Sequence, residues 1–541
     1  MFRDVLRIAD VRRVEAAWLA FNAGEWAIWV AILVYAYTAS GPASVGIVAV
    51  AQLLPAAIAA PLTAKIGDRM PRGRALTLAY ATTGAAMLAA GLAMFVGLPP
   101  LIVYVLAASV VVAYTSIRPI QSAILPAVVG RAEHLTAANA LSTLLEGTGV
   151  LIGPLLCGLV LTLASPAAVY VGAGVATLIA ALLVGPLHSL ASRPVVQAAS
   201  DVEPPAQTEA RRSRIQAVLA EPGRALAVAL LAARFGVAAA MDVLVVFASI
   251  EVLGMGQAGA GFLSAAIGVG WVVGGALTVG LVGRPHLTPL LLIGACIWAV
   301  PVVGVARVSE GTAALVLLVA AGIGLAVVDV AVRTVLQRLV PVEDLPSVFG
   351  LAEGASMGGA ATGALVAGVL VAVVGLGGAI VASALTLPLV ALAIFRTVGR
   401  DEAAHPIPFR QIALLRRLPL FAPLAPPALE AAAASLSAEA LPAGTSVITE
   451  GDVGDRFYAI EEGEVQVSQG GRVIGRLGPG SSFGELALIR DIPRTASVVT
   501  VTDVALEALD RDAFLLAITA SQGAADEAAR IAAAYRTRDD G

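Results

Sequence analysis

The chain has 541 residues, of which 58% are hydrophobic and 13% are charged, and its mean hydropathy is +0.89. An average soluble protein is nearer half apolar and a quarter charged, so this composition indicates an integral membrane protein. The formal net charge of −4 predicts no nucleic-acid partner, and the two cysteines, Cys157 and Cys296, lie in apolar runs that favour neither a disulfide framework nor a metal site.

The first part of the chain contains apolar runs that can cross a bilayer, for which a helix needs about 20 apolar residues. The N-terminal segment 1–15 is charged and amphipathic and lacks the short apolar core and cleavage site of a signal peptide. We expect about twelve spans of this length, at 15–38, 43–64, 75–97, 100–125, 138–163, 166–187, 225–250, 258–282, 287–306, 311–334, 348–374 and 378–396.

Basic residues alternate between the loops, as expected when loops alternate between cytoplasm and exterior. The loops on one side carry none apart from Arg307. The N-terminus, the loop after the second span and the central loop carry Arg3, Arg7, Arg12, Arg13, Lys65, Arg69, Arg72, Arg74, Arg211, Arg212, Arg214 and Arg224. We therefore predict a multi-pass protein of the plasma or inner membrane with both termini in the cytoplasm.

The apolar runs fall into two sets that resemble each other. "IRPIQSAILP" (117–126) and "VRTVLQRLVP" (332–341) have the same spacing of Arg and Pro, and each precedes a Glu-Gly pair in the next span. Such parallel repeats occur in transporters with a site between the halves. The predicted domains are a six-helix half at 1–187, a linker at 188–223 rich in Pro, Glu and Arg, a second half at 224–396, a second linker at 397–409 and a soluble domain at 410–541.

The last segment, 410–541, has a different character. It opens with short amphipathic helices, continues with alternating stretches punctuated by glycine, and closes with two helices. This pattern predicts a compact antiparallel β domain. It contains no nucleophile–base arrangement and no metal-ligand cluster, so we do not expect an enzyme or a required cofactor.

One loop of the membrane part resembles a signature of the major facilitator superfamily. In "AKIGDRMPRGR" (64–74), Asp68 and Arg69 match the family's pattern, whereas Ala64 replaces its first glycine and the basic tail is shifted. The resemblance implies that these two residues latch helix ends, for which an acid near a helix terminus gives a physical basis. The alternative is a solvated turn that follows the positive-inside bias.

Two further motifs carry the resemblance, which covers roughly residues 1–400. "RPIQS" (118–122) resembles the fourth-helix motif of the family. "GTGVLIGPLLCG" (147–158) resembles a fifth-helix motif of its proton-driven exporters, with Cys157 in place of a glycine. Small residues allow close helix packing and Pro154 allows a bend, so ordinary packing is the alternative. The resemblance implies a twelve-helix transporter fold and favours an exporter of small molecules.

Ionisable side chains inside spans are costly and are candidates for function. Glu25, with Asn22 one turn earlier, and Asp242, two turns beyond Arg234, are predicted to take part in transport or proton coupling, together with Asp329. A carboxylate in a low-dielectric setting can bind and release a proton, which makes protons the expected coupling ion. Structural or gating ion pairs are expected instead for Arg118 with Glu146 and for Arg333 with Glu353.

The stretch "FGELALIRDIPRTAS" (483–497) has the chemistry of an anion site. Gly484 allows the backbone to approach a ligand closely, and the short helix after it presents free N–H groups. Arg494 can meet a phosphate with paired hydrogen bonds. Glu485 can accept a hydrogen bond from a sugar hydroxyl, so the pair fits a ligand with one phosphate and one free hydroxyl.

This stretch closely resembles the phosphate-binding cassette of cyclic nucleotide-binding domains, a resemblance that covers about 410–541. It implies that Arg494 binds the cyclic phosphate and Glu485 the ribose 2′-hydroxyl. The residues expected to line the site are Phe483, Gly484, Leu486, Ala487, Thr495, Ala496 and Ser497. Ile531 and Tyr535 are the expected lid. The regulatory ligand is cAMP or cGMP, with cAMP preferred, and the alternative is a β-roll that has lost its ligand.

Together these features predict an all-α bundle of the major facilitator type fused to a C-terminal β-roll. The function predicted is secondary active transport, a proton-coupled export of a small molecule, regulated by a cyclic nucleotide on the cytoplasmic domain. Two alternatives stay open: a membrane-tethered cyclic-nucleotide receptor without transport activity, and export of the cyclic nucleotide itself.

Overall fold

The computed structural model describes residues 5–68, 70–129, 132–189, 216, 218–278, 286–340, 344–404, 408–424, 426–519 and 522–539. Within these ranges the side chains of 56–68, 132–136, 188–189, 346, 426–427, 522 and 532–539 are not described. The chain forms two compact units, residues 1–404 and 405–541.

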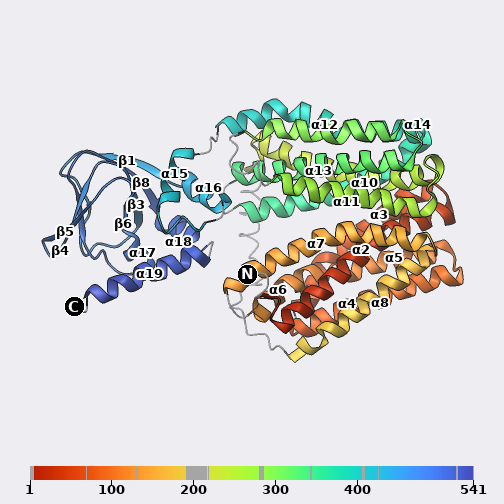
Figure 1. Ribbon diagram of the computed structural model, residues 1–541, viewed down its shortest axis with the longest axis horizontal. Coiled ribbons are helices and arrows are strands. Elements are labelled where there is room, and N and C mark those ends of the chain that lie inside the picture. The colour runs from red at the N-terminus through yellow and green to blue at the C-terminus, as the bar shows by residue number, and fades with distance from the viewer. Residues whose placement is uncertain are drawn as a thin grey trace. The chain divides into compact units, whose positions relative to one another are not determined.

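Unit 1 is helical throughout (Figure 1). Proline at the first turn starts several of its helices, where a missing N–H costs nothing, and Gly97 in a left-handed conformation ends α4. Its first half comprises α2 (Ala9–Ser40), α3 (Ala43–Asp68), α4 (Arg72–Val96), α5 (Pro100–Tyr114), α6 (Ile117–Val129), α7 (Ala132–Leu161), α8 (Pro166–Val184) and the 3₁₀ turn η1 (Gly185–Ser189).

The second half contains a helix that breaks in the middle. Gly375, at φ 74° and ψ 170°, separates α14 (Leu345–Ala404) into two consecutive helical segments. The other elements are α10 (Pro222–Phe247), the π-helical turn η2 (Ala248–Val252), α11 (Gly256–Thr278), α12 (Thr288–Val305) and α13 (Gly311–Leu339).

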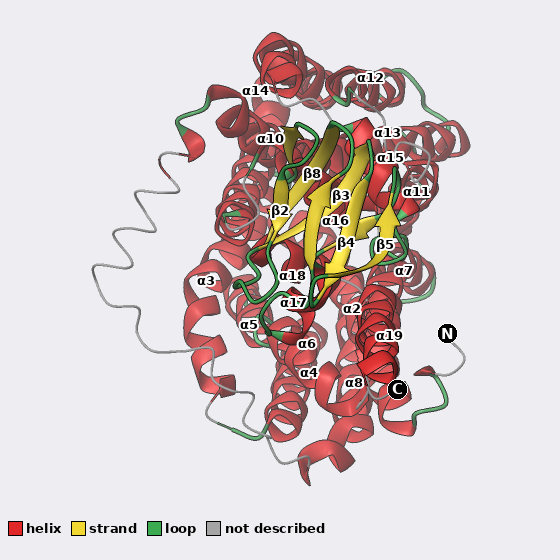
Figure 2. Ribbon diagram, turned by 90° about the vertical axis from the view of Figure 1, so that its left-hand side faces the viewer, coloured by secondary structure: helices red, strands yellow, loops and turns green. Residues whose placement is uncertain are grey.

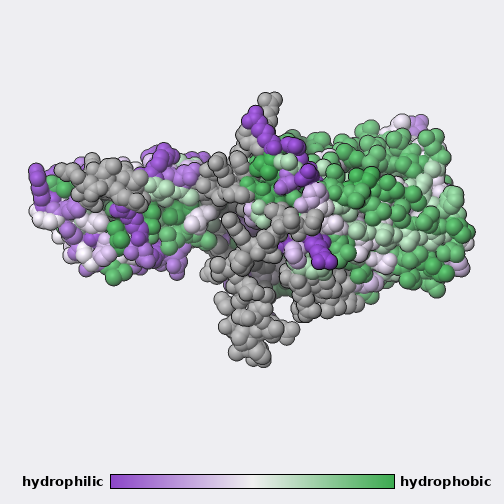
Figure 3. All heavy atoms as spheres, turned by 90° about the horizontal axis from the view of Figure 1, so that it is seen from below, coloured by the Kyte–Doolittle hydropathy of each residue, from purple (hydrophilic) through white to green (hydrophobic). Residues whose placement is uncertain are grey.

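Among the described residues, ten helices are long and apolar enough to cross a membrane. These ten count α5 with α6 as one span and α14 as one, and they leave out α3, whose described apolar part is Ala43–Pro55. Splitting α14 at Gly375 and adding α3 gives the twelve segments predicted from the sequence. Large apolar side chains such as Phe95 and Leu163 are exposed, and the face of this unit in Figure 3 is mostly hydrophobic. The chain is a multi-pass membrane protein.

Glycines let the two halves approach closely. A Cβ on Gly261 of α11 would lie 2.3 Å from the backbone nitrogen of Gly158 on α7. A Cβ on Gly46 of α3 would lie 2.6 Å from the carbonyl oxygen of Ala364 on α14. Small residues at helix contacts are the usual basis of close packing in membranes.

The apolar interior of unit 1 is divided in two. The larger cluster, which we call the shared core, joins the second half to the later part of α2, from Ala27 to Ala36, and to residues of α3, α4, α5, α7 and α8. The smaller cluster, the first-half core, contains only first-half residues, between Val5 and Leu187, including Val11 to Phe21 at the start of α2. The two halves therefore share apolar packing toward one end of the bundle, whereas the first-half core packs separately toward the end where α2 begins.

Unit 2 is a β-roll with flanking helices, and Figure 2 draws its strands in yellow. Two four-stranded antiparallel sheets have the orders β1-β8-β3-β6 and β2-β7-β4-β5. The strands are β1 (Ser437–Leu441), β2 (Ser446–Ile448), β3 (Arg456–Glu462), β4 (Val465–Gln469), β5 (Arg472–Leu477), β6 (Ser482–Phe483), β7 (Ser497–Thr500) and β8 (Val504–Asp510). The helices are α15 (Phe409–Arg417), α16 (Pro426–Ala434), α17 (Glu485–Arg490), α18 (Arg511–Thr519) and α19 (Gln522–Asp539).

Two apolar clusters hold unit 2 together. One lies between the two sheets and includes Ile460, Val465 and Leu506. The other joins the flanking helices to β3 through Phe421, Phe457 and Phe514, whose ring centroids lie 5.1–6.1 Å apart. The predicted combination of a helical membrane bundle and a C-terminal β-roll is confirmed.

Candidate functional site

The turn between β6 and α17 forms the first part of the candidate site. Gly484 takes φ +90°, a left-handed conformation that other residues adopt at a cost. A Cβ on it would lie 2.8 Å from Nη1 of Arg494. Before the turn, the Phe483 ring stacks on Tyr458 at 5.1 Å, because β6 pairs with β3 at these two residues. Glycine is therefore required here both by conformation and by space.

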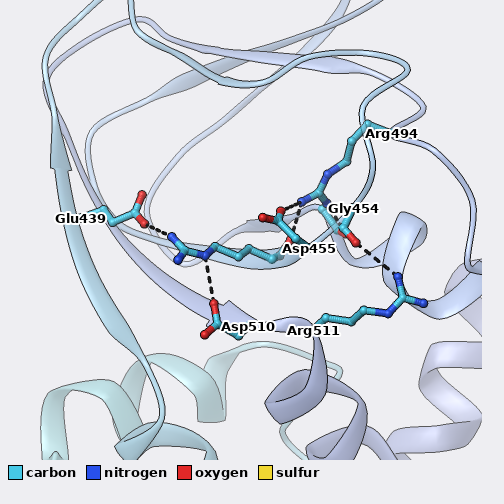
Figure 4. Close-up of polar contacts among 8 residues, drawn as sticks. Glu439, Gly454, Asp455, Arg494, Asp510 and Arg511 are labelled. Carbon is cyan, nitrogen blue, oxygen red and sulfur yellow. Dashed lines mark hydrogen bonds and ion pairs between the residues drawn. The ribbon is translucent and has the colours of Figure 1, made fainter.

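Arg494 lies buried behind this turn, with 5% of its surface exposed. Its Nη1 donates to the carbonyl oxygen of Gly484 at 2.9 Å, and its Nη2 donates to the carbonyl of Arg456 at 2.7 Å. Asp455 Oδ1 lies 3.5 Å from Nη2, a contact drawn as a dashed line in Figure 4. Burial lowers the pKa of Arg494, and the nearby Asp455 carboxylate opposes that shift. The guanidinium is thus fixed by backbone carbonyls, and the carboxylate that forms its ion pair, Asp455, is largely exposed.

Glu485 is the first residue of α17 and is also buried. Burial raises the pKa of its carboxyl group, and hydrogen bonding to its own backbone and the nearby Arg494 oppose that rise. Its Oε2 has no hydrogen-bond partner among the described residues. A buried acceptor left unpaired is costly, so this oxygen is suited to receive a hydroxyl donor from a ligand.

The remaining cassette residues surround these two side chains. Leu486 and Ala487 are buried in α17, and the Ala487 side chain packs close to Gly454, where a Cβ would lie 2.7 Å away. Thr495 and Ala496 are half-buried. The hydroxyl of Ser497, at the start of β7, accepts a hydrogen bond from the backbone nitrogen of Glu450 at 2.9 Å. The structure therefore gathers the whole predicted set around one short loop.

Residues 454–456, on the other side of Arg494, were not predicted from the sequence to take part in the site. Arg456 contacts Glu439 at 2.7 Å and Asp510 at 2.9 Å, which ties β1, β3 and β8 together, and Figure 4 labels these two acids. Arg511 donates to the Gly454 carbonyl at 3.3 Å. The sequence signal for these residues is Gly-Asp-Arg at the start of β3. It does not indicate a contact with Arg494, which lies 40 residues after Gly454. Of the expected lid, Ile531 packs against the flanking helices, and the side chain of Tyr535 lies outside the described residues.

In unit 1, Arg118 of α6 lies between carboxylates of two other helices. Its Nη2 is 2.9 Å from Glu25 Oε2 on α2, and its Nη1 contacts Glu146 Oε1 on α7. Its guanidinium also lies over the Trp18 ring, 5.5 Å from the centroid. Asn22 donates to the Trp18 carbonyl at 2.8 Å. The structure thus brings Glu25 into the ion pair that the sequence suggested between Arg118 and Glu146.

The second half contains another charged cluster. It has two arginines around one acid, whereas the Arg118 cluster has two acids around one arginine. Asp329 of α13 lies 3.4 Å from Arg234 Nε on α10 and 3.2 Å from Arg333 Nε, one turn along its own helix. Arg234 is 3% exposed and lies over Trp271, 4.8 Å from the ring centroid. Arg333 therefore pairs with Asp329, its neighbour at i−4, whereas Glu353 is exposed.

Polar contacts join α2 of the first half to α10 and η2 of the second. Trp29 Nε1 donates to Asp242 Oδ2 at 3.0 Å. Further along α2, the Tyr37 hydroxyl donates to Glu251 Oε1 at 2.5 Å. The remaining predicted residues, Asp68 and Arg69, fall outside the part whose side chains are described. Among the described residues, no group of three or more His, Cys, Asp or Glu side chains could hold a metal ion.

Comparisons with known proteins give matches to parts of both units. A family model described as "Cyclic nucleotide-binding domain" matches residues 438–520. The chain is 37% identical over 102 residues to a cAMP-dependent protein kinase regulatory subunit of Yarrowia lipolytica, covering 18% of this chain and 27% of the relative. It is 49% identical over 72 residues to the cGMP-dependent protein kinase egl-4 of Caenorhabditis elegans, covering 13% of this chain and 9% of that one. The chain thus spans about a quarter or less of these relatives.

Solved structures also match part of the chain. The regulatory domain of Toxoplasma gondii PKA with cAMP is 35% identical, with a TM-score of 0.20, and the match covers 20% of this chain and 43% of that one. Thermus thermophilus Catabolite Activator Protein is 33% identical, with a TM-score of 0.21, and the match covers 23% of this chain and 60% of that one.

The membrane unit has its own match. A family model described as "Major Facilitator Superfamily" matches residues 17–302, which is more than half of the chain. The matched region runs from α2 to α12 and so includes the Arg118 cluster and the Trp29–Asp242 contact. The chain belongs to the major facilitator superfamily and carries a C-terminal cyclic nucleotide-binding domain.

Proposed function

We propose that this protein is a proton-coupled exporter of a small molecule whose transport is regulated by cAMP. The observation that carries the proposal is the site of unit 2. The buried guanidinium of Arg494 and the buried carboxylate of Glu485, whose Oε2 lacks a hydrogen-bond partner among the described residues, flank the turn at Gly484. The same chain contains the two-half transporter bundle.

Recognition of the nucleotide rests on Arg494 and Glu485. The cyclic phosphate binds at the turn, where the Arg494 guanidinium and the N–H groups that open α17 favour an anion. The ribose 2′-hydroxyl donates to Glu485. The matched relatives include one named for cAMP and one named for cGMP, and we favour cAMP as the ligand.

Calorimetry on the full-length protein tests this site. Arg494→Ala should weaken cAMP binding by about 1.5–3 kcal/mol, the contribution of a charged hydrogen bond, or roughly 10- to 150-fold in Kd. Arg472→Ala removes an exposed arginine from β5 and serves as the matched control. Unchanged affinity in the Arg494 variant would mean that the anion is held elsewhere.

Transport is proposed to use the carboxylates at Glu25 and Asp242. Glu25 is paired with Arg118 in the first half, and Asp242 is hydrogen-bonded to Trp29 across the halves. Protonation of either group would weaken its polar contact, which links proton binding to rearrangement of the helices. Export, rather than uptake, is favoured by the α7 motif, where Gly149 and Gly153 pack against α2 and Gly158 packs against α11.

Proton flux in proteoliposomes tests the transport proposal. A panel of amphipathic compounds should include some that drive proton movement through the wild-type protein, and Glu25→Gln or Asp242→Asn should abolish it. Glu310→Gln changes an acid at the N-cap of α13 that makes no side-chain cap hydrogen bond, and should leave the flux unchanged.

We further infer an orientation and a state. The arginine-rich end, where α2 begins and α14 ends, is assigned to the cytoplasm of the plasma or inner membrane by the positive-inside bias. The α2 part of the shared core, Ala27 to Ala36, and the Tyr37–Glu251 contact then lie toward the outer side. This arrangement supports an inward-facing state, in which the halves are joined outside and separate inside.

Regulation follows if the nucleotide binds the two states with different affinity, since a ligand shifts an equilibrium only by that difference. The effect is reciprocal, so transported substrate should change cAMP affinity. If saturating substrate leaves calorimetric cAMP binding unchanged, equilibrium coupling is excluded.

A membrane-tethered receptor without transport is the second candidate, and its own nucleotide site would be identical. Absence of proton flux with every compound, combined with intact cAMP binding, would favour it. Uptake of labelled cAMP into inside-out vesicles would instead identify the nucleotide itself as the cargo.

A further inference from the structure

The last turn of α14, immediately before the chain enters unit 2, carries two consecutive acids that bind other helices. Asp401 Oδ2 accepts a hydrogen bond from the backbone nitrogen of Gly223 at 2.9 Å. Gly223 follows Pro222 at the start of α10, where backbone N–H groups have no partner within the helix. Asp401 therefore caps α10 from a residue 178 positions away in the chain.

Glu402 makes a second, more extensive set of contacts. Its Oε1 accepts from the backbone nitrogen of Leu287 at 2.7 Å. Its Oε2 accepts from the backbone nitrogen of Thr288 at 3.0 Å and from the Thr288 hydroxyl at 2.7 Å. Arg338, near the end of α13, lies 3.8 Å from Oε1. Glu402 is 7% exposed, and it joins the start of α12 to the end of α13.

These contacts hold one turn of α14 to three helices of the second half, and we call them the α14 clasp. A carboxylate at a helix N-terminus meets unpaired N–H groups and a favourable dipole. The buried N–H groups at Leu287 and Thr288 would lose these carboxylate partners without Glu402, so the contacts are costly to break. Residue 404 is therefore fixed to the ends of α10, α12 and α13.

The same helices carry the polar groups described above. α10 bears Arg234 and Asp242, the latter bonded to Trp29 of the first half, and α13 bears Asp329 and Arg333. A displacement applied at the end of α14 is thus delivered to the helices that meet the first half. The clasp contacts named above lie at the ends of α10, α12 and α13 in the second half.

The chain is also fixed on the other side of the joint. Gln411 Nε2 donates to Glu507 Oε1 at 2.9 Å, which attaches α15 to β8 of the β-roll. Arg410 lies 2.7 Å from Glu461, next to β3. Residues 403–409 alone separate the α14 clasp from this attachment, so the chain between them can span at most about 25 Å.

We propose that Asp401 and Glu402 are the positioning residues through which nucleotide binding acts on the transporter: they make α10, α12 and α13 move together with the joint. This inference rests on the proposed regulation by cAMP. In this proposal the clasp transmits the signal and takes no part in binding the nucleotide.

Pulsed electron spin resonance on the full-length protein in nanodiscs tests the proposal. Spin labels at Ser122→Cys on α6 and Gln337→Cys on α13, in a background without Cys157 and Cys296, report the separation of the halves at the arginine-rich end; both positions are exposed. With the clasp intact, cAMP should change the populations of the distance distribution. In Asp401→Ala/Glu402→Ala, the cAMP-induced change should fall at least fivefold, while the Kd for cAMP stays within twofold.

Matched variants separate coupling from folding. Glu221→Ala removes an exposed acid at the N-cap of α10 that makes no side-chain cap bond. This variant should keep the full cAMP-induced change in the distance distribution. Asp401→Asn keeps an acceptor oxygen and should also respond. Glu402→Gln keeps one acceptor oxygen of two and should respond partially, which tests the idea even if the double variant does not fold.

The outcomes are distinguishable. A full cAMP response in the double alanine variant overturns the clasp as the route and leaves the proposed regulation standing. If cAMP binds but produces no change in the protein with an intact clasp, the proposed regulation itself fails, and this inference fails with it. A loss of cAMP affinity in the clasp variants would also contradict the proposal, because it would place these residues in nucleotide binding.

Discussion

Trp29 of the first half donates its indole N–H to the carboxylate of Asp242 in the second, at 3.0 Å. The contact lies beside the shared core, where residues 27–36 of α2 pack with the second half. Two turns further along the same helix, Tyr37 binds Glu251. The halves are therefore joined along the later part of α2 and not along its beginning.

Removing the Tyr37 hydroxyl should favour separation of the halves at this end. A hydrogen bond of this kind contributes roughly 0.5–1.5 kcal/mol, so Tyr37→Phe should shift the ratio of the two states about two- to tenfold. The Ser122/Gln337 label pair should then report shorter distances as the other end closes. Tyr35→Phe is the control, since the Tyr35 ring packs on Tyr104 within the first half. An unchanged distribution would mean that Tyr37 does not hold this end closed.

Gly484 should not tolerate a side chain. Gly484→Ala combines a left-handed backbone, which costs about 1–2 kcal/mol, with a close contact to the Arg494 guanidinium. We expect cAMP affinity to fall at least fivefold in calorimetry. Gly475→Ala provides the comparison, because a Cβ there meets nothing within 4 Å and the residue lies in a strand. Equal behaviour of the two variants would contradict the role given to the turn.

Glu485 should discriminate for the ribose 2′-hydroxyl. If its unpaired Oε2 accepts this hydroxyl, the wild-type protein binds cAMP more tightly than 2′-deoxy-cAMP, roughly tenfold for a hydrogen bond to a charged group. Glu485→Ala should remove the difference between the two ligands. A preference that survives in the variant would assign the hydroxyl to another residue.

Glu507 should make the stability of the β-roll depend on pH. Burial raises the pKa of this β8 carboxyl, with the Gln411 hydrogen bond opposing the rise. The folded protein therefore holds a proton that the unfolded chain releases, so stability is highest below the unfolded pKa of 4.5 and falls as pH rises through the raised value.

Glu507→Gln should remove this decline while its amide oxygen still accepts from Gln411. Hydrogen exchange of peptides from β8, corrected for intrinsic rates and compared from pH 4.5 upward, measures the effect. The exposed Glu464→Gln is the control. Parallel curves for the wild type and the Glu507 variant would contradict the prediction.

The sequence was sufficient to predict the fold class of both units, because span length and the glycine pattern of a β-roll are properties of short segments. Glu485 and Arg494 were predictable as a pair for the same reason: one loop carries both. Asp455 and Arg456 were not, because they reach Arg494 only through the pairing of β3 with β6 and the folding of the chain around it.

The charged groups of the membrane unit illustrate the same limit. Arg118 and Glu146 lie on consecutive predicted spans and could be paired by inspection. The addition of Glu25 depends on how α2 is rotated about its axis, which the length of an apolar run does not determine. The α14 clasp was hidden for another reason: Asp401 and Glu402 look like the polar start of a linker until the ends of α10 and α12 are seen beside them.

The division of the apolar interior also bears on how the protein is made. The first-half core uses only residues between Val5 and Leu187, so every side chain it needs has left the ribosome before the second half is synthesised. The shared core instead extends to Val398 and is complete only when translation has nearly finished unit 1. Insertion should therefore proceed through an intermediate in which one end of the first half is already packed while its other end does not yet contact the second half.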